Sequence, residues 1–233
     1  EKLGIPVFVT EPRTLADIPR LLRVLGKLAG TADAAEEEAR RFEQTLEELA
    51  RRYGNKRPVS VFYQIWHQPL MTVNAEHIIS DVIRLCGGRN VFESSPAFTP
   101  VLSAESLLVA DPEVMIASVS ALPAQAEVRR FWSGFPSLRA VRRSHLEFVH
   151  PDLIQRQAPR ILEGAKQVCE ALEKARERFT AKAGHRLGCV GKIERTTDGA
   201  CRQVLQDSGR RFRAVDDRLC GQSPKRDNRR SPV

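Results

Sequence analysis

A run of aromatic and neutral polar residues follows one of the clearest predicted strands in the sequence. Residues 59–65 are rich in β-branched and aromatic residues, which predicts a strand that ends near Gln64. Trp66, His67 and Gln68 come directly after it. In open α/β sheets, ligands bind beyond the carboxyl ends of the strands. An indole, an imidazole and two amides suit a ligand with large apolar surfaces and little charge. We therefore expect Gln64, Trp66, His67 and Gln68 to form one wall of a ligand-binding site. The alternative for Trp66 is that it is an aromatic residue of the protein core or of the surface, without a role in binding.

Other chemistries find little support in the residue types and their spacing. The sequence has no glycine-rich phosphate loop, no G-x-S-x-G motif and no paired catalytic carboxylates, which argues against an enzyme and predicts no cofactor. His67 is the one histidine in a polar loop, and a histidine of this kind more often forms hydrogen bonds than coordinates a metal. Cys86 and Cys169 lie 83 positions apart without a C-x-x-C motif. On these residues alone they are either two buried thiols or one long-range disulfide, but not a zinc site.

The positive charge of the chain is concentrated at its end. The formal net charge is +8, from 37 Lys and Arg against 29 Asp and Glu. Residues 179–233 hold 13 of these basic and 6 of the acidic residues, so residues 1–178 carry 24 and 23. The main body is therefore nearly neutral, which predicts no nucleic-acid partner. The segment 179–233 has little apolar periodicity, and we expect it to be disordered or foreign to the domain, with a basic nucleic-acid-binding arm as the alternative.

No stretch of the sequence is apolar enough to predict a membrane span. The longest uncharged stretch, 58–75, is interrupted by amides, a histidine and a proline. The first residues, Glu1 to Gly4, carry no secretory signal and precede an apolar run. We expect such a start to belong to the middle of a domain.

Two helices are expected near the start of the chain. Residues 4–10 (GIPVFVT) read as a strand, and apolar residues at helical spacing predict a helix over 15–28. A second, longer helix is expected over 31–53. Its apolar positions form a narrow stripe on a charged rod, which suits a helix lying along two bodies. The stripe consists of Ala35, Ala39, Phe42, Leu46, Leu49 and Tyr53.

Alternating strands and helices follow. Strands are expected at 59–65, 114–118 and 146–149, a short strand or turn at 90–92, and helices at 77–86, 103–110, 124–132 and 158–178. This order predicts an α/β lobe with a mainly parallel sheet flanked by helices. The expected organisation is therefore residues 1–30 as the remnant of a first α/β lobe, 31–55 as an interlobe helix, 56–178 as the ligand-binding lobe and 179–233 as a tail.

Four segments carry a resemblance to a known family. These are GIPVFVTEPRTLADI (4–18), VFYQIWHQPLMTVNAEHIISDVIRLCGGRNVF (61–92), VLSAESLLVADPEVMIAS (101–118) and PDLIQRQAPRILEGAKQVCEAL (151–172). Their order and spacing resemble those of periplasmic cobalamin-binding proteins, the class with two α/β lobes joined by a rigid helix. The resemblance implies a periplasmic, monomeric solute receptor that binds cobalamin between its lobes and delivers it to the membrane subunit of an ABC transporter. It also implies that most of a first lobe precedes Leu3.

The resemblance assigns roles to further residues. It implies a disulfide between Cys86 and Cys169. Glu105 matches an exposed glutamate that docks into arginine pockets of the membrane subunit, the alternative being an ordinary first-turn glutamate. Phe98 is a second aromatic platform for the corrin, unless the aromatic position of the family falls on Thr99. An aromatic of the family is replaced within residues 152–156, where Asp152 and Arg156 either contact ligand amides or simply pair with each other.

Two other functions remain open at this stage. A siderophore-iron or haem receptor of the same fold usually calls for Arg, Tyr or His clusters, and Tyr63 is the one plausible tyrosine beside the expected cleft. A truncated fragment that binds no ligand is the other alternative. Its unpaired strand over residues 4–10 is then expected to drive association through an exposed edge.

Overall fold

The structure, a computed structural model, describes residues 7–187, 193–195, 201–203 and 213–214, with side chains up to 178. The chain divides into two compact units, Glu1–Arg178 and Phe179–Val233. In the second unit, β7 (Ile193–Arg195), β8 (Cys201–Gln203) and β9 (Arg213–Ala214) pair as an antiparallel sheet. The expected disorder of residues 179–233 is wrong for the described part, which consists of the end of helix α8 (Ile161–Leu187) and these three strands. The other residues of that segment lie outside the described residues, and the predicted division into four parts stays a prediction.

An antiparallel pair of helices opens the first unit. Helix α1 (Asp17–Leu28) and helix α2 (Ala32–Tyr53) match the two helices expected there. They pack closely at Gly26, where an added Cβ would lie 2.2 Å from the Ala35 Cβ. Arg23 joins them by ion pairs of 2.7 Å to Glu36 and to Glu43. The hydrogen bonds from the Arg23 guanidinium hold the pKa of Glu36 at about 2, so the carboxylate stays charged at neutral pH.

The prediction of a strand at residues 4–10 is wrong for residues 7–10, the part that the structure describes. Residues 7–10 have no regular structure, and Val7 and Val9 are about 80% exposed. No described strand pairs with them. β-propensity reflects a fit to neighbouring strands more than an intrinsic preference of the backbone. Without such a neighbour the apolar residues alone do not form a strand.

Four parallel strands form the centre of the unit. They are β1 (Val59–Gln64), β4 (Gly88–Asn90), β5 (Val114–Ser118) and β6 (Leu146–Val149), in the order β4-β1-β5-β6. The predicted α/β fold class, a mainly parallel sheet flanked by helices, is confirmed. The near-continuous burial of β1 and β5 is typical of parallel strands covered on both faces.

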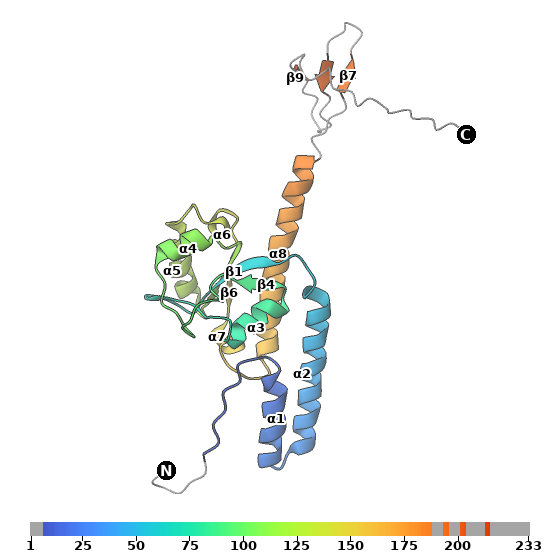
Figure 1. Ribbon diagram of the computed structural model, residues 1–233, viewed down its shortest axis with the longest axis vertical. Helices are drawn as coiled ribbons and strands as arrows, with labels where there is room; N and C mark the ends of the chain where they lie inside the picture. Colours follow the sequence, from blue (N-terminus) through green and yellow to red (C-terminus); the bar gives the residue numbers. More distant parts are fainter. Residues whose placement is uncertain (1–6, 188–192, 196–200, 204–212, 215–233) are drawn as a thin grey trace, which may run out of the picture. The chain divides into compact units, whose positions relative to one another are not determined.

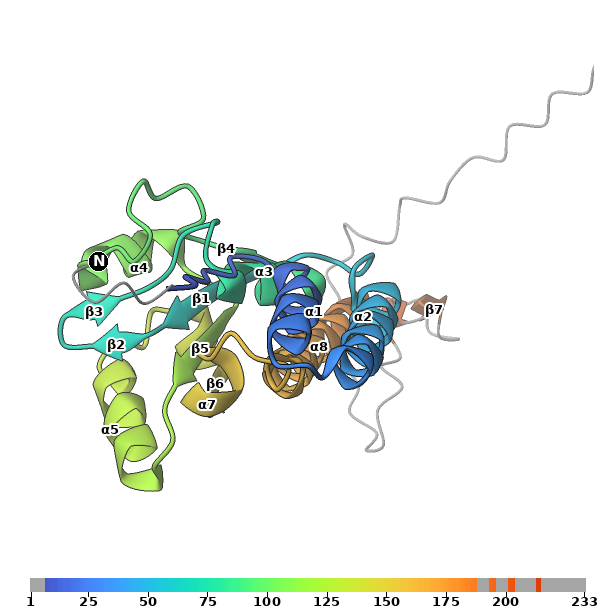
Figure 2. The ribbon, with the colours of Figure 1, turned by 90° about the horizontal axis from the view of Figure 1, so that it is seen from below.

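Helices cover both faces of this sheet. Side chains of α1, α2, α3 (Ile78–Leu85), α7 (Pro151–Ile154) and α8 (Ile161–Leu187) share one apolar core with the odd-numbered residues of β1. Helices α4 (Ala104–Ala110), α5 (Leu122–Ser133) and α6 (Arg139–Arg142) share the other core with Phe62 and Met115. Figure 2 shows α1, α2, α3 and α8 on one side of the strands and α4 and α5 on the other, and Figure 1 gives the course of the chain. Among the described residues, no helix combines the length and apolar character that a bilayer crossing needs.

The end of α3 is tied firmly to α8. Cys86 and Cys169 form the disulfide that the resemblance implied, with Cα atoms 4.7 Å apart. Beside it, the buried Arg176 guanidinium donates to the carbonyls of Cys86, Gly87 and Arg57. Gly87 ends the helix with a φ of +68°, a conformation that favours glycine. These contacts hold the amino-terminal ends of β1 and β4 against α8, at the edge of the sheet opposite the candidate site.

Candidate functional site

A short ribbon extends from the carboxyl end of β1. Strands β2 (Trp66–His67) and β3 (Leu70–Met71) pair in an antiparallel hairpin whose turn contains a cis peptide before Pro69. Met71 forms a further antiparallel bridge with Val101. The Leu102 N–H donates to the Leu70 carbonyl at 2.8 Å. The segment predicted as a loop is therefore a two-stranded ribbon, extended by one bridge to Val101, and Figure 2 shows β2 and β3 beyond the end of β1.

The pairing places three apolar side chains in one row across this ribbon. Trp66 lies opposite Met71, and Met71 lies opposite Val101. Directly opposed residues of antiparallel strands project from the same face. Trp66 and Val101 are 56% and 63% exposed, and Met71 is half-buried. We call these three residues the apolar row. The Trp66 indole N–H donates to the Gln68 carbonyl at 2.9 Å, which fixes the ring within the hairpin.

Of the residues predicted for this wall, Trp66, His67 and Gln68 lie together on the hairpin, whereas Gln64 does not. The Gln64 side chain is buried, and its oxygen accepts a 2.7 Å hydrogen bond from the Trp132 indole N–H of α5. Gln64 therefore joins the sheet to α5 inside the lobe. His67 Nε2 lies 3.8 Å from the Glu127 carboxylate, also on α5. Glu127, Met71 and Val101 are additions to the predicted set, and the Gln68-Pro69 turn between two short apolar segments is the signal that could have indicated the ribbon.

Phe98 is held between two side chains from different parts of the chain. Its ring is 4.9 Å from the His77 ring, and the Arg13 guanidinium lies 5.8 Å from its centroid. Burial lowers the pKa of His77 to about 4, so the imidazole is neutral at physiological pH. Phe98 remains 40% exposed. It is a partly covered aromatic surface, and its predicted contact with a ligand stays a prediction.

Asp152 and Arg156 form an ion pair at the carboxyl end of β6. Asp152 Oδ1 lies 2.9 Å from Arg156 Nη2, so the simpler of the two readings of this pair, a direct ion pair, is confirmed. Asp152 belongs to α7, a single turn that the sequence did not predict. His150 caps this turn by accepting a hydrogen bond from the Asp152 N–H. The Arg156 side chain is exposed and that of Asp152 is partly exposed, so both have surface that a ligand can contact.

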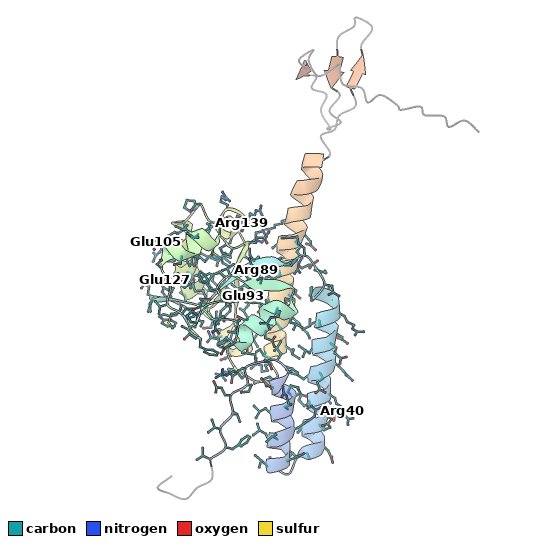
Figure 3. All side chains as sticks on the ribbon, viewed as in Figure 1. Arg40, Arg89, Glu93, Glu105, Glu127 and Arg139 are labelled. Carbon is teal, nitrogen blue, oxygen red and sulfur yellow. A yellow bond between two sulfur atoms is a disulfide. The ribbon has the colours of Figure 1, made fainter. Side chains whose placement is uncertain are left out.

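Glu105 lies in the first turn of α4. Ser103 caps this helix, its hydroxyl accepting a hydrogen bond from the Ser106 N–H at 3.2 Å. The Glu105 side chain is exposed, and Figure 3 shows it on the side of the lobe away from Arg40 of α2. Hydrogen bonds from its own backbone N–H and from the Ser103 hydroxyl lower the pKa of Glu105. It is therefore an ionised, accessible carboxylate at neutral pH.

Tyr63, the tyrosine expected beside the cleft, lies inside the protein. Its side chain is fully buried under α7, and burial raises its pKa to about 12. Among the described residues, no group of three or more His, Cys, Asp or Glu has the arrangement to hold a metal ion. The arrangement found after β1 is thus an exposed apolar row beside an imidazole and an amide, and the Asp152–Arg156 ion pair follows β6, two strands away in the sheet. It can bind by apolar contact and hydrogen bonding.

An open parallel α/β lobe with an exposed apolar row at its carboxyl edge suits the binding of a small molecule, and the comparisons with known proteins identify the class. The family model described as periplasmic binding protein matches residues 1–152. The chain belongs to this family, and the predicted resemblance and periplasmic location are confirmed at that level. The family is one of solute-binding proteins rather than of enzymes.

The chain is also similar to individual proteins that are named vitamin B12-binding proteins. The Vitamin B12-binding protein of Vibrio cholerae is 30% identical over 176 residues, covering 76% of this chain and 63% of the relative. That of Yersinia pestis is 32% identical over 171 residues, covering 73% and 58%. The crystal structure of the periplasmic Vitamin B12 binding protein BtuF of Vibrio cholerae matches with a TM-score of 0.68 at 30% identity, covering 75% of this chain and 68% of that chain. A haem-bound structure of BhuT, at 18% identity and a TM-score of 0.63, shares the fold. The chain thus spans about 63% of the length of the first of these curated relatives.

Proposed function

We propose that this chain is part of a periplasmic receptor that binds cobalamin and delivers it to the membrane subunit of an ABC transporter. The apolar row carries this proposal. A corrin is flat and largely apolar on its faces and has neutral amides at its rim. Trp66, Met71 and Val101 offer a matching surface, and His67 and Gln68 supply hydrogen-bonding groups beside it. In this proposal the chain catalyses no reaction, needs no cofactor and acts as a monomer.

The similarity to relatives named for vitamin B12 supports cobalamin over iron ligands. Haem and siderophore receptors usually need exposed Tyr, His or Arg clusters. Tyr63 cannot serve that purpose in this structure because its side chain has no exposed surface. Glu105 is proposed as the docking residue for the transporter, since it is ionised and lies on α4, clear of the ribbon.

Equilibrium dialysis of the purified chain against cyanocobalamin tests the ligand. Trp66→Ala should weaken binding about tenfold, because it removes an exposed aromatic surface from the row. Trp66→Phe should retain most of the affinity. Val109→Ala is the matched control, since Val109 is 88% exposed but belongs to α4, outside the ribbon. Binding of haem but not cyanocobalamin, or equal binding by wild type and Trp66→Ala, would refute the proposed site.

A further inference from the structure

Two aliphatic side chains of α4 face solvent beside Glu105. Val109 is 88% exposed and Leu108 is 37% exposed, whereas Leu107 is fully buried and anchors the helix to the lobe. Residues three and four positions apart lie on the same side of an α-helix. Glu105, Leu108 and Val109 therefore share one side of α4, opposite Leu107. We call these three residues the α4 face.

The α4 face is poor in charge for an exposed surface. Glu105 is the one charged residue of the seven-residue helix, and Ser106 is its remaining exposed residue. On α2, by contrast, most exposed positions carry charged side chains. Single exposed aliphatic residues are ordinary in proteins, but the centres of protein–protein interfaces combine apolar side chains with few charges. Two adjacent aliphatic side chains beside one carboxylate thus suit contact with another protein.

Both ends of α4 are held in place within the lobe. At its start, the Ser103 hydroxyl accepts the Ser106 N–H. At its end, Asp111 has a φ of +37°, in the left-handed region, and its carboxylate accepts the Arg139 backbone N–H at 2.7 Å. The Arg139 guanidinium also donates to the Asp111 carbonyl at 3.0 Å. Because the helix is fixed from both ends, a partner that docks on it has little chain left to order.

The charge of the α4 face distinguishes between two kinds of partner. A second copy of the chain, docked by two-fold symmetry, would bring this face against itself. Two Glu105 carboxylates would then share a small contact area, and α4 has no basic residue to offset their repulsion. A different protein that offers a cation beside an apolar surface meets no such repulsion. The membrane subunit of the transporter is the partner for which Glu105 is already proposed as the docking residue.

Resting on the proposed function, we propose that Leu108 and Val109 form an apolar docking contact with the membrane subunit, beside the charged contact of Glu105. The two contributions differ in kind. The carboxylate attracts and orients the partner over a distance, and salt weakens this attraction. The aliphatic side chains stabilise the complex by leaving water, which salt does not screen. The matching surface of the membrane subunit is therefore apolar next to a positively charged side chain.

Binding of the whole chain to the cobalamin ABC transporter in lipid nanodiscs tests this contact, with surface plasmon resonance as the measurement and empty nanodiscs as the reference. Val109→Ser and Leu108→Ser should each raise the Kd for the transporter about three- to tenfold, by the same factor at low and at high salt. Glu105→Ala should raise it at low salt and reduce its dependence on salt. Leu28→Ser is the matched control, since Leu28 is 68% exposed on α1. None of these substitutions should change the Kd for cyanocobalamin.

Four other outcomes would overturn this contact, each for a different reason. If Val109→Ser and Leu108→Ser bind the transporter as the wild type does, while Glu105→Ala binds more weakly, the apolar contact is wrong and the docking role of Glu105 stands. If the wild type binds cyanocobalamin but not the transporter, the apolar contact and the proposed delivery both fail. Equal binding to empty nanodiscs would mean that the chain meets lipid. Wild-type dimers in analytical ultracentrifugation that Val109→Ser dissociates would make the α4 face a contact between copies.

Discussion

Gln64 and Trp66 occupy positions close together in the sequence but have opposite surroundings. Gln64 is the last residue of β1, and its side chain points toward α5, where the Trp132 indole N–H needs an acceptor. Trp66 begins the hairpin and projects from the lobe. The first residue stabilises the lobe and the second is available to a ligand. Substitutions of Gln64 should therefore change the stability of the protein, whereas substitutions of Trp66 should change its affinity for ligand.

Gln64→Leu should destabilise the protein by about 1–3 kcal/mol, because it leaves the buried Trp132 N–H without an acceptor. Urea unfolding followed by circular dichroism measures this loss. Gln68→Leu is the matched control, since it places the same change on an exposed residue of the hairpin turn. Equal unfolding midpoints for the wild type and Gln64→Leu would contradict the role of this hydrogen bond.

Glu105→Ala should leave cyanocobalamin binding intact and weaken stimulation of the transporter. The carboxylate is exposed and ionised, and it belongs to α4 rather than to the ribbon. ATPase activity of the reconstituted transporter, measured with increasing amounts of receptor, reports docking. Glu127→Ala gives an acidic comparison beside His67. Stimulation by Glu105→Ala equal to that of the wild type would dismiss the docking role.

At the scale of the elements, the start of α1 depends on one carboxylate. Asp17 accepts hydrogen bonds from the Thr14 hydroxyl and from the backbone N–H groups of Arg13 and Thr14. The Thr14 hydroxyl is the main cause of the lowered pKa of Asp17, ahead of its backbone partners. A lowered folded-state pKa means that the unfolded chain binds protons more readily. The contribution of Asp17 is therefore full above its ordinary pKa of 3.8 and is lost as the pH falls below it.

Asp17→Asn should lower the free energy of unfolding by on the order of 1 kcal/mol at neutral pH. The difference from the wild type should shrink as the pH falls below about 4, where both proteins lack this charge. Urea unfolding at several pH values measures it. Asp33→Asn, in the first turn of α2, removes an exposed carboxylate and serves as control. A difference that grows as the pH falls would contradict the assignment.

The disulfide should make a large contribution to stability, because it closes a loop of 83 residues between α3 and α8. Replacing both cysteines, Cys86→Ala with Cys169→Ala, should lower the free energy of unfolding by about 2–5 kcal/mol. Reductant should destabilise the wild type by a similar amount and leave the double variant unchanged. Wild-type unfolding that is insensitive to reductant would show that the bridge contributes nothing.

Elements with strong local patterns were predictable from the sequence, and those that depend on distant partners were not. The stripe from Ala35 to Tyr53 predicted α2, and the apolar run 114–118 predicted β5 with the bounds observed. The hairpin strands contain two residues each and α7 contains four, too few to show a period. The partner of Gln64 is 68 residues away, so nothing near Gln64 indicates that its side chain is buried.

At the scale of the whole molecule, we expect the affinity of this chain for cobalamin to be limited because it supplies only one of the two lobes that would contact the ligand. Its match covers 63% of the Vibrio cholerae relative. If two lobes contribute similarly to a binding free energy of about −12 kcal/mol, one lobe retains about −6 kcal/mol, which corresponds to a Kd near or weaker than ~10 μM. Calorimetric titration with cyanocobalamin measures this value. Nanomolar binding by the chain would contradict the division between lobes.

The ribbon that bears the apolar row satisfies its own backbone groups, through the Ile65 N–H to the Met71 carbonyl and the Thr72 N–H to the Pro100 carbonyl. These backbone hydrogen bonds do not involve the side chains of Trp66, Met71 and Val101. Substitutions at these three positions should therefore change ligand preference more than they change the backbone pairing of the ribbon. A library randomised at these positions alone is a compact starting point for receptors that select other flat molecules.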